Sequence, residues 1–385
     1  MDHATQVTLA RRLLDFLDRR TTEMTAAPYE NPVAVYTSAA QLIEERRCLF
    51  RREPLLIGLS CDLAAPGAYV VHDAAGVPIL VTRDSGGTLR AFLAVCRHRG
   101  ARLACGEGVG TGRFTCPFHG WTYDKAGRLV SQPCAERFAG IDADTLSLVP
   151  LPVAERHGLV FARATPSGAI DVDAQLAGAE LELAPFGLEH YVRFARREVC
   201  CRVNWKLVID TFLEAYHVPT LHARTLAATI AGSPAAFDAF GRGGRMIATR
   251  RSLPELRALP EAEWNLLAHT VVLYNLFPNT MLIHQIDHVE VVQVYPSAEG
   301  PDASVVTFSL YIPEPPGSEG ARRHFQSNFD LLLGTILEED FPLAEGIQQG
   351  FHADPGARVI FGRNEPGVAH YQRMVREALV ACGGG

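Results

Sequence analysis

The sequence predicts an α+β protein with a small antiparallel β domain and a larger mixed domain. Residues 55–164 consist of short alternating apolar runs separated by Gly, Pro and Asp, which is typical of antiparallel strands and their turns. Beyond residue 164, longer strand-like runs alternate with helical stripes. At 385 residues and 48% hydrophobic composition, the chain can form two cores, so we expect domains at 51–164 and 165–385.

An N-terminal helical segment is expected over residues 1–50. Its first helix, between Gln6 and Arg20, follows from leucines that recur at helical spacing at Leu9, Leu13, Leu14 and Leu17. A second stripe runs from Ser38 to Phe50. Apolar stripes bury against another element, so we expect this segment to pack on the larger domain.

Strands of the small domain are expected where short apolar runs occur, at Tyr69–Val71, Ile79–Thr82, Leu89–Phe92 and Leu159–Phe161. Asp84–Gly87 and Asp124–Gly127 are turn signals between such strands. In the larger domain we expect strands at about Tyr191–Val203, Val271–Ile286 and Val289–Tyr295, and helices at about Trp205–His217 and Ala321–Phe351.

Composition excludes several classes of function. A formal net charge of −7 and a pI near 6.1 argue against a nucleic-acid partner, which would require a basic face. The nine cysteines do not read as a disulfide framework in a chain of this length, which indicates a reducing compartment. The N-terminus lacks the apolar core of a signal peptide, and no apolar run reaches the roughly 18 residues of a membrane span. We expect a soluble, cytoplasmic protein with no membrane partner.

The densest group of metal-ligating side chains lies at residues 96–119, as C-R-H at 96–98 and C-P-F-H at 116–119. Two thiolates and two imidazoles suit a Cys₂His₂ zinc site, or a [2Fe–2S] cluster with cysteines on one iron and histidines on the other. Zinc sites of this composition usually have both cysteines in one knuckle and both histidines in the other, whereas each knuckle here carries one cysteine and one histidine. The pattern favours a Rieske cluster, with the ligands Cys96, His98, Cys116 and His119.

A second group of candidate ligands lies on a predicted helix. Asp210, Glu214 and His217 fall at i, i+4 and i+7 and so share one face. His222 would diverge from His217 by roughly 140° on an unbroken helix, and Pro219 supplies the break that lets the two converge. Two histidines plus one carboxylate form the facial triad of mononuclear iron(II) oxygenases.

Residues 96–100 (CRHRG) and 116–121 (CPFHGW) resemble the Rieske domain of ring-hydroxylating oxygenase α subunits. Electron-transport Rieske proteins differ, because they carry an extra cysteine after each ligand pair, where this chain has Ala101 and Phe118. The resemblance implies that the larger domain is a helix-grip (START-like) catalytic domain, with a curved antiparallel sheet over a helix.

The resemblance also implies the remaining site residues. Asp340 matches the position of the third iron ligand, with rivals Glu338, Glu339 and Glu345. Glu214 matches a carboxylate that joins the iron histidine to His119 of the partner subunit in a head-to-tail trimer, and Asp210 is a candidate to support it. The longer Glu at this position resembles members that act on quaternary amines.

The implied function is that of a terminal oxygenase. Electrons would come from NAD(P)H through a partner reductase, with or without a ferredoxin, and pass through the Rieske [2Fe–2S] cluster to mononuclear iron(II). There O₂ would oxidise a small organic substrate, which we expect to be aromatic, by hydroxylation or dihydroxylation. N- or O-demethylation of a quaternary amine or methoxy compound is an alternative. A Rieske electron carrier or sensor without oxygenase activity is a third interpretation. The sequence leaves open whether a β subunit is present.

Two further histidines, His284 and His288, flank Asp287 on a predicted strand, where they would face the same side. Such residues are more often core or surface histidines than ligands. The neighbouring run 277–283 resembles the family's pocket-wall strand, which suggests an apolar cavity there.

Overall fold

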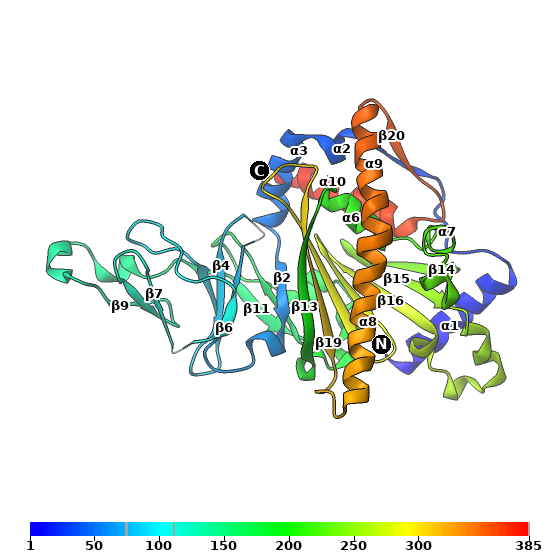
Figure 1. The fold of residues 1–385 in the computed structure, drawn as a ribbon, viewed down its shortest axis with the longest axis horizontal. Coiled ribbons are helices and arrows are strands. Elements are labelled where there is room, and N and C mark those ends of the chain that lie inside the picture. Colours follow the sequence, from blue (N-terminus) through cyan, green and yellow to red (C-terminus); the bar gives the residue numbers. More distant parts are fainter. Residues whose placement is uncertain (74–75, 111, 384–385) are drawn as a thin grey trace. The chain divides into compact units, whose positions relative to one another are not determined.

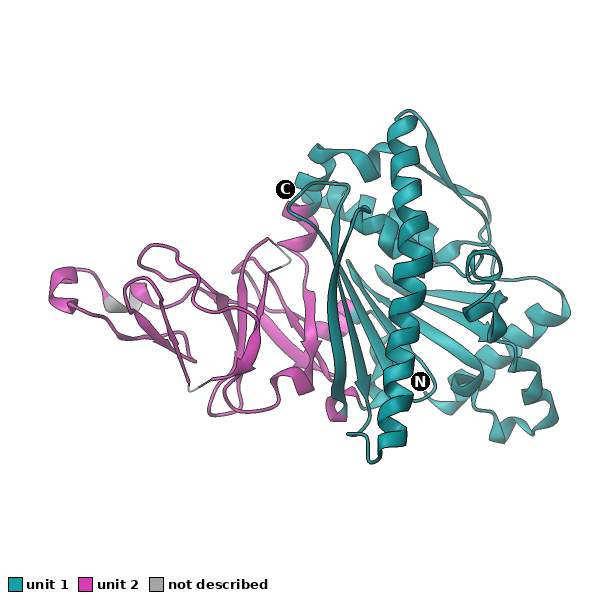
Figure 2. Cartoon of the chain, viewed as in Figure 1, with its two compact units in different colours: residues 1–45, 176–187, 191–385 teal, residues 46–175, 188–190 magenta. Residues whose placement is uncertain are grey.

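The computed structural model describes residues 1–73, 76–110 and 112–383 of the chain. Two compact units divide it, as Figure 2 shows. Unit 1 comprises Met1–Glu45, Leu176–Gly187 and Tyr191–Gly385, and unit 2 comprises Arg46–Gln175 and Leu188–His190. Both units contain antiparallel sheets and unit 1 adds long helices, so the predicted α+β class is confirmed.

Unit 2 is built from three antiparallel sheets, with strand orders β10-β5-β4-β3-β6, β11-β12-β2 and β7-β8-β9. Its strands are β2 (Leu55–Leu59), β3 (Ala68–His72), β4 (Ile79–Arg83), β5 (Leu89–Leu93), β6 (Glu107–Val109), β7 (Arg113–Thr115), β8 (Thr122–Asp124), β9 (Leu129–Ser131), β10 (Pro150–Leu151), β11 (Val153–Arg156) and β12 (Leu159–Ala162). Apolar side chains such as Leu80 and Phe92 pack in one cluster with Cys96 and Cys116. The core of unit 2 therefore supports the cysteines directly.

Unit 1 is built on a seven-stranded antiparallel sheet in the order β13-β19-β18-β17-β16-β15-β14. Its strands are β13 (Val192–Cys201), β14 (Ile230–Phe240), β15 (Gly243–Arg250), β16 (Thr270–Leu276), β17 (Thr280–His284), β18 (Val289–Pro296) and β19 (Ser304–Ile312). A long helix crosses this sheet in Figure 1, formed by α8 (Glu319–Thr335), the π-helical turn η11 (Ile336–Asp340) and α9 (Phe341–Ala353). This helix-over-sheet arrangement agrees with the one that the resemblance implies.

Shorter elements complete the fold. A two-stranded antiparallel ladder joins β1 (Tyr29–Pro32) to β20 (Arg358–Phe361). The remaining α-helices are α1 (His3–Asp18), α2 (Ala34–Thr37), α3 (Ala39–Glu45), α4 (Val172–Leu176), α5 (Glu180–Leu183), α6 (Trp205–Phe212), α7 (Val218–Leu221) and α10 (Pro366–Gly383). The helix expected over residues 38–50 is α3 followed by a π-helical turn, η1 (Arg46–Phe50).

Helix α1 lies in unit 1, where it packs against β14. Leu9, Leu13 and Leu14 of the predicted stripe are buried. On the polar side, the guanidinium of Arg12 donates to both carboxylate oxygens of Asp238 in β14 at 2.9 Å. The stripe and this ion pair together fix the helix on the sheet.

The strand expected over residues 271–286 is two strands, β16 and β17, which pair with each other in a hairpin. Pro278 lies in the turn between them. Because proline has no N–H for a sheet ladder, the run of apolar residues cannot continue as one central strand. The sequence prediction was wrong here in counting one strand.

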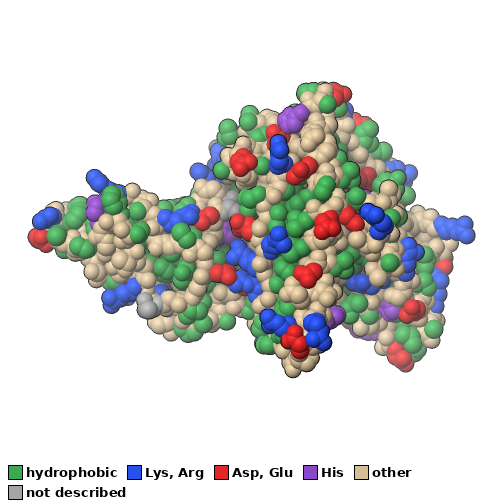
Figure 3. Space-filling model, in the orientation of Figure 1, with side chains coloured by type: hydrophobic (Ala, Val, Ile, Leu, Met, Phe, Trp, Pro, Cys, Tyr) green, Lys and Arg blue, Asp and Glu red, His purple; other side chains and the backbone are tan. Residues whose placement is uncertain are grey.

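The surface drawn in Figure 3 carries acidic and basic side chains that are interspersed. Among the described residues, no helix combines the length and apolar character that crossing a membrane requires.

Candidate metal centres and active-site cavity

Two loops of unit 2 share one hydrogen-bonding pattern. In the first, the N–H of Gly100 donates to the carbonyl of Cys96 (2.9 Å), whose own N–H donates to the carbonyl of Ala101 (2.8 Å). In the second, the N–H of Gly120 donates to the carbonyl of Cys116 (3.0 Å), and the N–H of Cys116 donates to the carbonyl of Trp121 (2.7 Å). Both glycines have a φ of +73°, which a residue with a side chain adopts only with strain. The same local loop structure therefore occurs twice, and in each case the glycine four residues after the cysteine permits it.

The four predicted cluster ligands pair by type. The thiols of Cys96 and Cys116 are buried and lie within hydrogen-bonding range of each other. The rings of His98 and His119 have centroids 4.6 Å apart. Trp121 stacks on His98 at 4.9 Å and covers it. This pairing suits a cluster with two thiolates on one iron and two imidazoles on the other.

The protonation state of these side chains also suits a metal cluster. Burial favours the neutral thiol of Cys116, but donation from the N–H groups of Phe118 and His119 lowers its pKa overall. Partial burial and the neighbouring His119 lower the pKa of His98, so its neutral form is favoured. The Nδ1 atom of His98 is buried and has no hydrogen-bond partner among the described residues. An unpaired nitrogen beside two buried thiols, one of them with a lowered pKa, fits a [2Fe–2S] group.

Tyr123 is a partner of this site. Its hydroxyl lies 3.4 Å from Sγ of Cys96 and accepts a hydrogen bond from the N–H of Arg97 at 3.0 Å. Burial, followed by the contact with Cys96, raises the pKa of the phenol. Tyr123 therefore stays a neutral donor that can face the cysteine sulfur.

In unit 1, the helix predicted over residues 205–217 ends early, at Phe212 in α6. The carboxylate of Glu214 accepts hydrogen bonds from the N–H groups of Tyr216 and His217, the latter at 3.1 Å. These bonds compete with the helical ladder and begin a new turn, α7. Pro219 lies in the first turn of α7, where a missing N–H costs nothing. The expected break is real, but Glu214 rather than Pro219 accompanies it.

This break brings the two predicted iron histidines together. The Nε2 atoms of His217 and His222 are 3.1 Å apart. Oδ1 of Asp340 lies 3.3 Å from Nε2 of His222 and 3.8 Å from Nε2 of His217. The three donor atoms all lie within 4.8 Å of one another. Two imidazoles and a carboxylate converging on one point fit a single metal ion with open coordination positions.

Asp340 reaches this point because the long helix is widened there. The predicted helix 321–351 contains the π-helical turn η11, whose last residue is Asp340. Pro342 follows, and it can donate no N–H to the ladder, which favours such a defect. Of the rival carboxylates, Glu338 is exposed and Glu345 accepts a hydrogen bond from the N–H of Arg202 at 3.2 Å, away from the histidines.

The other nitrogen of each histidine is held by a carboxylate. Nδ1 of His217 donates to Glu214, and Nδ1 of His222 donates to Glu339 at 2.6 Å. Glu339 also accepts from Thr225 at 2.8 Å. The bond from His222 lowers the pKa of Glu339, so the carboxylate stays ionised. Both imidazoles are thereby fixed with Nε2 toward the ion, as in carboxylate–histidine–metal triads.

Glu339 is thus a functional candidate in a different role from the one considered from sequence, where it was a rival ligand. The available signal was its position beside Asp340: on a helical turn two adjacent carboxylates point in different directions, so one can face the ion and the other the histidine behind it.

Asp210 lies outside this group. Its carboxylate accepts hydrogen bonds from Oη of Tyr36 (2.7 Å) and Nε2 of Gln372 (2.7 and 2.9 Å). Burial raises its pKa to about 7. The structure does not bring Asp210 to Glu214, because the expected common helix face ends at Phe212.

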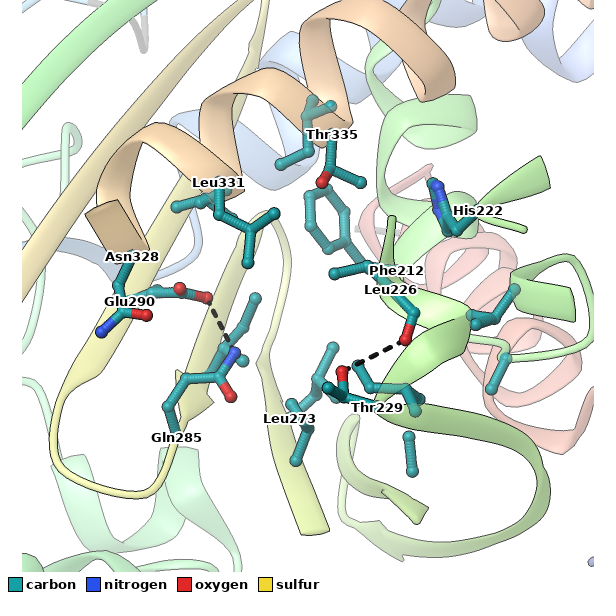
Figure 4. A pocket seen from close by; sticks show the side chains of 18 of the residues that line it. Phe212, His222, Leu226, Thr229, Leu273, Gln285, Glu290, Asn328, Leu331 and Thr335 are labelled. Atoms are coloured by element: carbon teal, nitrogen blue, oxygen red, sulfur yellow. Dashed lines mark hydrogen bonds between the residues drawn. The ribbon is translucent and has the colours of Figure 1, made fainter. Parts of the chain in front are cut away.

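A cavity of about 360 Å³ in unit 1 opens beside the triad (Figure 4). Its walls are largely apolar and include Leu226, Met246, Leu273 and Ile283, with Phe212 near the histidines. His288 lines the cavity, whereas His284 stacks on Phe186 at 4.3 Å and is not among the lining residues. The two histidines are separated by the turn between β17 and β18, so the expectation that they share a strand was wrong.

Comparisons with known proteins agree with this division. Residues 188–381 match the family described as ring hydroxylating alpha subunit (catalytic domain), and residues 53–151 match the Rieske [2Fe–2S] domain. The first match runs from before β13 into α10 and contains the triad. The second contains both cysteine–histidine loops.

Among curated relatives, the carnitine monooxygenase oxygenase subunit of Escherichia coli (strain K12) is 34% identical over 196 residues, covering 50% of this chain and 51% of the relative. The chlorobenzene dioxygenase subunit alpha of Cupriavidus sp. (strain PS12) is 34% identical over 208 residues, covering 52% and 45%. The chain thus spans about half the length of the curated relatives it matches. A solved quaternary ammonium Rieske monooxygenase has the same fold, with a TM-score of 0.79 at 22% identity over 93% of this chain and 95% of that chain.

Proposed function

The chain belongs to the ring-hydroxylating α-subunit family, and we propose that it acts as the terminal oxygenase of an electron-transfer system. The observation that carries the proposal is the convergence of His217, His222 and Asp340 beside an apolar cavity. An electron carrier or sensor would have no need of three metal donors at a substrate-sized cavity. The proposed cluster ligands are Cys96, His98, Cys116 and His119.

When bound, a [2Fe–2S] cluster supplies electrons one at a time and an iron(II) ion supplies the activation of dioxygen. Hydroxylation consumes one O₂, two electrons and two protons and releases one water; dihydroxylation of an arene consumes the same and keeps both oxygen atoms. The electrons would come from NAD(P)H through a reductase, with or without a ferredoxin. Either stoichiometry is compatible with relatives that include a monooxygenase and a dioxygenase.

The residues of this chain would position the reaction. Glu214 and Glu339 hold the Nδ1 protons of the two histidines and leave each Nε2 free. The apolar walls of the cavity exclude water and accept a small organic substrate. N-demethylation of a quaternary amine is the second candidate, supported by Glu at position 214 and by the carnitine monooxygenase relative.

We further propose that the chain works as a homotrimer in which Glu214 faces His119 of the partner subunit. Exposed aromatic side chains support a protein contact at both ends of this link. Phe118 is 59% exposed beside His119, and Tyr216 is 72% exposed beside His217. Large exposed aromatic residues are typical of interfaces.

The test compares two isosteric variants, Glu214→Gln and Glu339→Gln. Both change a carboxylate on Nδ1 of an iron histidine, but only Glu214 is assigned to the link between subunits. At saturating iron(II), which offsets a loss of metal affinity, we expect Glu214→Gln to keep both metals and to lose turnover by about 100-fold, because the reduced cluster no longer delivers electrons to the iron. Single-turnover oxidation of the reduced cluster, with substrate and O₂, measures this step directly.

Full activity of Glu214→Gln with unchanged coupling of O₂ to product would exclude the link. Equal losses in both variants, each matched by lost iron, would reduce Glu214 to a positioning role. Metal analysis that finds no third iron per chain, in protein with an intact cluster, would exclude the oxygenase and favour the electron carrier.

A further inference from the structure

The cavity of unit 1 has a polar end that the metal site does not use. It is formed by side chains from β15, from the turn that joins β17 to β18, from β18 itself and from α8: Arg250, Gln285, Asp287, His288, Glu290, His324 and Asn328. Figure 4 shows Glu290, Gln285 and Asn328 on the opposite side of the cavity from His222.

Helix α8 gives the cavity its length. Asn328, Leu331 and Thr335 lie on one helical face that lines the cavity, and the same helix continues to Asp340. Twelve residues separate Asn328 from Asp340, which corresponds to roughly 18 Å along the axis at a helical rise of about 1.5 Å per residue. The polar end and the metal donors are therefore at different levels of the helix, with leucines between them.

Glu290 is a charged group of the polar end that has no short hydrogen bond. Its side chain is only 5% exposed. It receives two long hydrogen bonds, from Nε2 of His288 at 3.3 Å and from Nε2 of Gln285 at 3.4 Å. An ionised carboxylate can accept about four hydrogen bonds, and short ones are preferred. Glu290 can therefore accept further donors.

The neighbouring charges are already engaged elsewhere. Asp287 accepts from Nδ1 of His288 at 2.8 Å and from Nε2 of His324 at 2.7 Å. The guanidinium of Arg250 donates to Oε1 of Gln285 at 2.7 Å, and makes no ion pair with Glu290 within 4.0 Å among the described contacts. Arg250 and His288 are close enough for their charges to interact with Glu290, but neither gives it a short hydrogen bond, so Glu290 can still accept short donors.

A second unmet polar group points to a ligand in the same cavity. Thr335 is 5% exposed, lines the cavity, and its hydroxyl has no hydrogen-bond partner among the described residues. A buried hydroxyl without a partner costs free energy unless a bound molecule supplies one. Glu290 on β18, with long bonds only, and Thr335 on α8, with none among the described residues, line the same cavity, which suits a substrate that carries polar atoms.

We propose that Glu290 binds a protonated amine of the substrate, whose apolar remainder extends past Leu331 toward the triad. The substrate class is then an organic ammonium ion that bears N–H donors. Binding of the amine does not depend on the proposed oxygenase function, but the position of oxidation does. With the nitrogen at Glu290, the carbon that is oxidised at the triad lies several bonds away from the nitrogen. A quaternary ammonium has no N–H and cannot satisfy Glu290.

The experiment measures binding of four probes with one skeleton to the anaerobic holoenzyme by titration calorimetry. The probes are 4-phenylbutylamine, its N,N,N-trimethylammonium analogue, 4-phenylbutan-1-ol and 4-phenylbutanoate. We expect the primary amine to bind at least about 10-fold more tightly than each of the others, as a charged hydrogen bond in a buried site predicts. Glu290→Gln removes this preference.

Asp287→Asn is the matched control, because it removes the same charge from a carboxylate that already has its donors. We expect it to keep most of the preference for the amine. A wild-type preference for the carboxylate, the alcohol or the quaternary ammonium overturns the proposal, and so does an unchanged preference in Glu290→Gln. The wild-type ranking decides even if the variants do not fold. Because the ranking is measured by binding, the amine proposal can be wrong while the oxygenase function is right. The oxygenase function is tested by iron content and turnover instead.

Discussion

The two candidate metal sites are built in opposite ways. In unit 2, each cysteine–histidine pair lies on a short loop closed by its own backbone, with a glycine at φ +73° four residues after the cysteine. In unit 1, His217 and His222 lie near a helix end, whereas Asp340 comes from a π-helical turn more than a hundred residues later. One site is specified by local turns and the other by packing between distant elements.

The difference extends to the groups that orient the ligands. Around the thiol of Cys116 the donors are the backbone N–H groups of Phe118 and His119, which a tight loop supplies without further side chains, and the thiol of Cys96 has the hydroxyl of Tyr123 at 3.4 Å. Around His217 and His222 they are the side chains of Glu214 and Glu339. Substitutions should therefore damage the first site through backbone strain and the second through lost carboxylates.

The largest effect is expected from removing a ligand at either site. Asp340→Ala should lower the iron content from about three to about two per chain and abolish turnover, because two histidines alone hold iron(II) weakly. Cys116→Ser should do the reverse, with loss of the cluster and retention of the single ferrous ion. Iron analysis and the electron paramagnetic resonance spectrum of the reduced protein separate the two outcomes.

These variants also test whether the sites are independent. If Asp340→Ala lost the cluster together with the ferrous ion, the comparison between a local and a distributed site would fail.

A smaller effect is expected at the carboxylate behind His222. Glu339→Gln should weaken binding of the mononuclear metal by roughly 10- to 100-fold while the cluster spectrum stays unchanged, because the amide holds the Nδ1 proton less strongly. Titration of the iron-depleted site with Co(II) gives the affinity directly. Glu338→Gln is the matched control, since Glu338 is exposed and lies outside the triad. Equal affinities in the two variants would remove Glu339 from the site.

The loop glycines should show backbone strain. A side chain at Gly100 would meet no atom within 4 Å, so Gly100→Ala tests the positive φ alone. We expect it to destabilise unit 2 by about 1–2 kcal/mol and to loosen the cluster. Gly350→Ala, at an exposed position within α9, should instead stabilise unit 1 by about 0.5–1 kcal/mol. Urea denaturation, followed by cluster absorbance and by circular dichroism, measures the change in unfolding free energy for both variants. A change of the same sign in both would show that the positive φ of Gly100 is not the cause.

The last effect concerns pH and Asp210, and it acts on stability rather than on either metal site. Burial raises the pKa of this carboxyl from 3.8 to about 7 in the folded protein. The folded chain thus keeps a proton that the unfolded chain has released, so the free energy of unfolding falls as the pH rises from about 4 through 7. Asp210→Asn should flatten this dependence and retain both metals. Denaturation midpoints of the two proteins at pH 5 and pH 7.5 test it, and parallel slopes would count against a structural role.

The sequence predicted most elements near their observed positions but missed where they break. The helix 205–217 and the strand 271–286 are each interrupted, at Glu214 and at Pro278. Proline in a strand was a readable signal. The capping by Glu214 was not, because it depends on the carboxylate folding back on the N–H groups of the residues that follow it.

The sequence alone predicted the four cluster ligands, the two histidines of the second site and the local geometry of the first. The spacing of residues 96–119 suffices, because each loop closes within six residues through its own hydrogen bonds. Only the tertiary structure decided that Asp340 rather than Glu338 or Glu345 joins the histidines, that Glu339 stands behind His222, and that Asp210 is a buried structural group. The physical reason is that the direction of a helical carboxylate is set by the register of distant elements against each other, and no local pattern encodes that register.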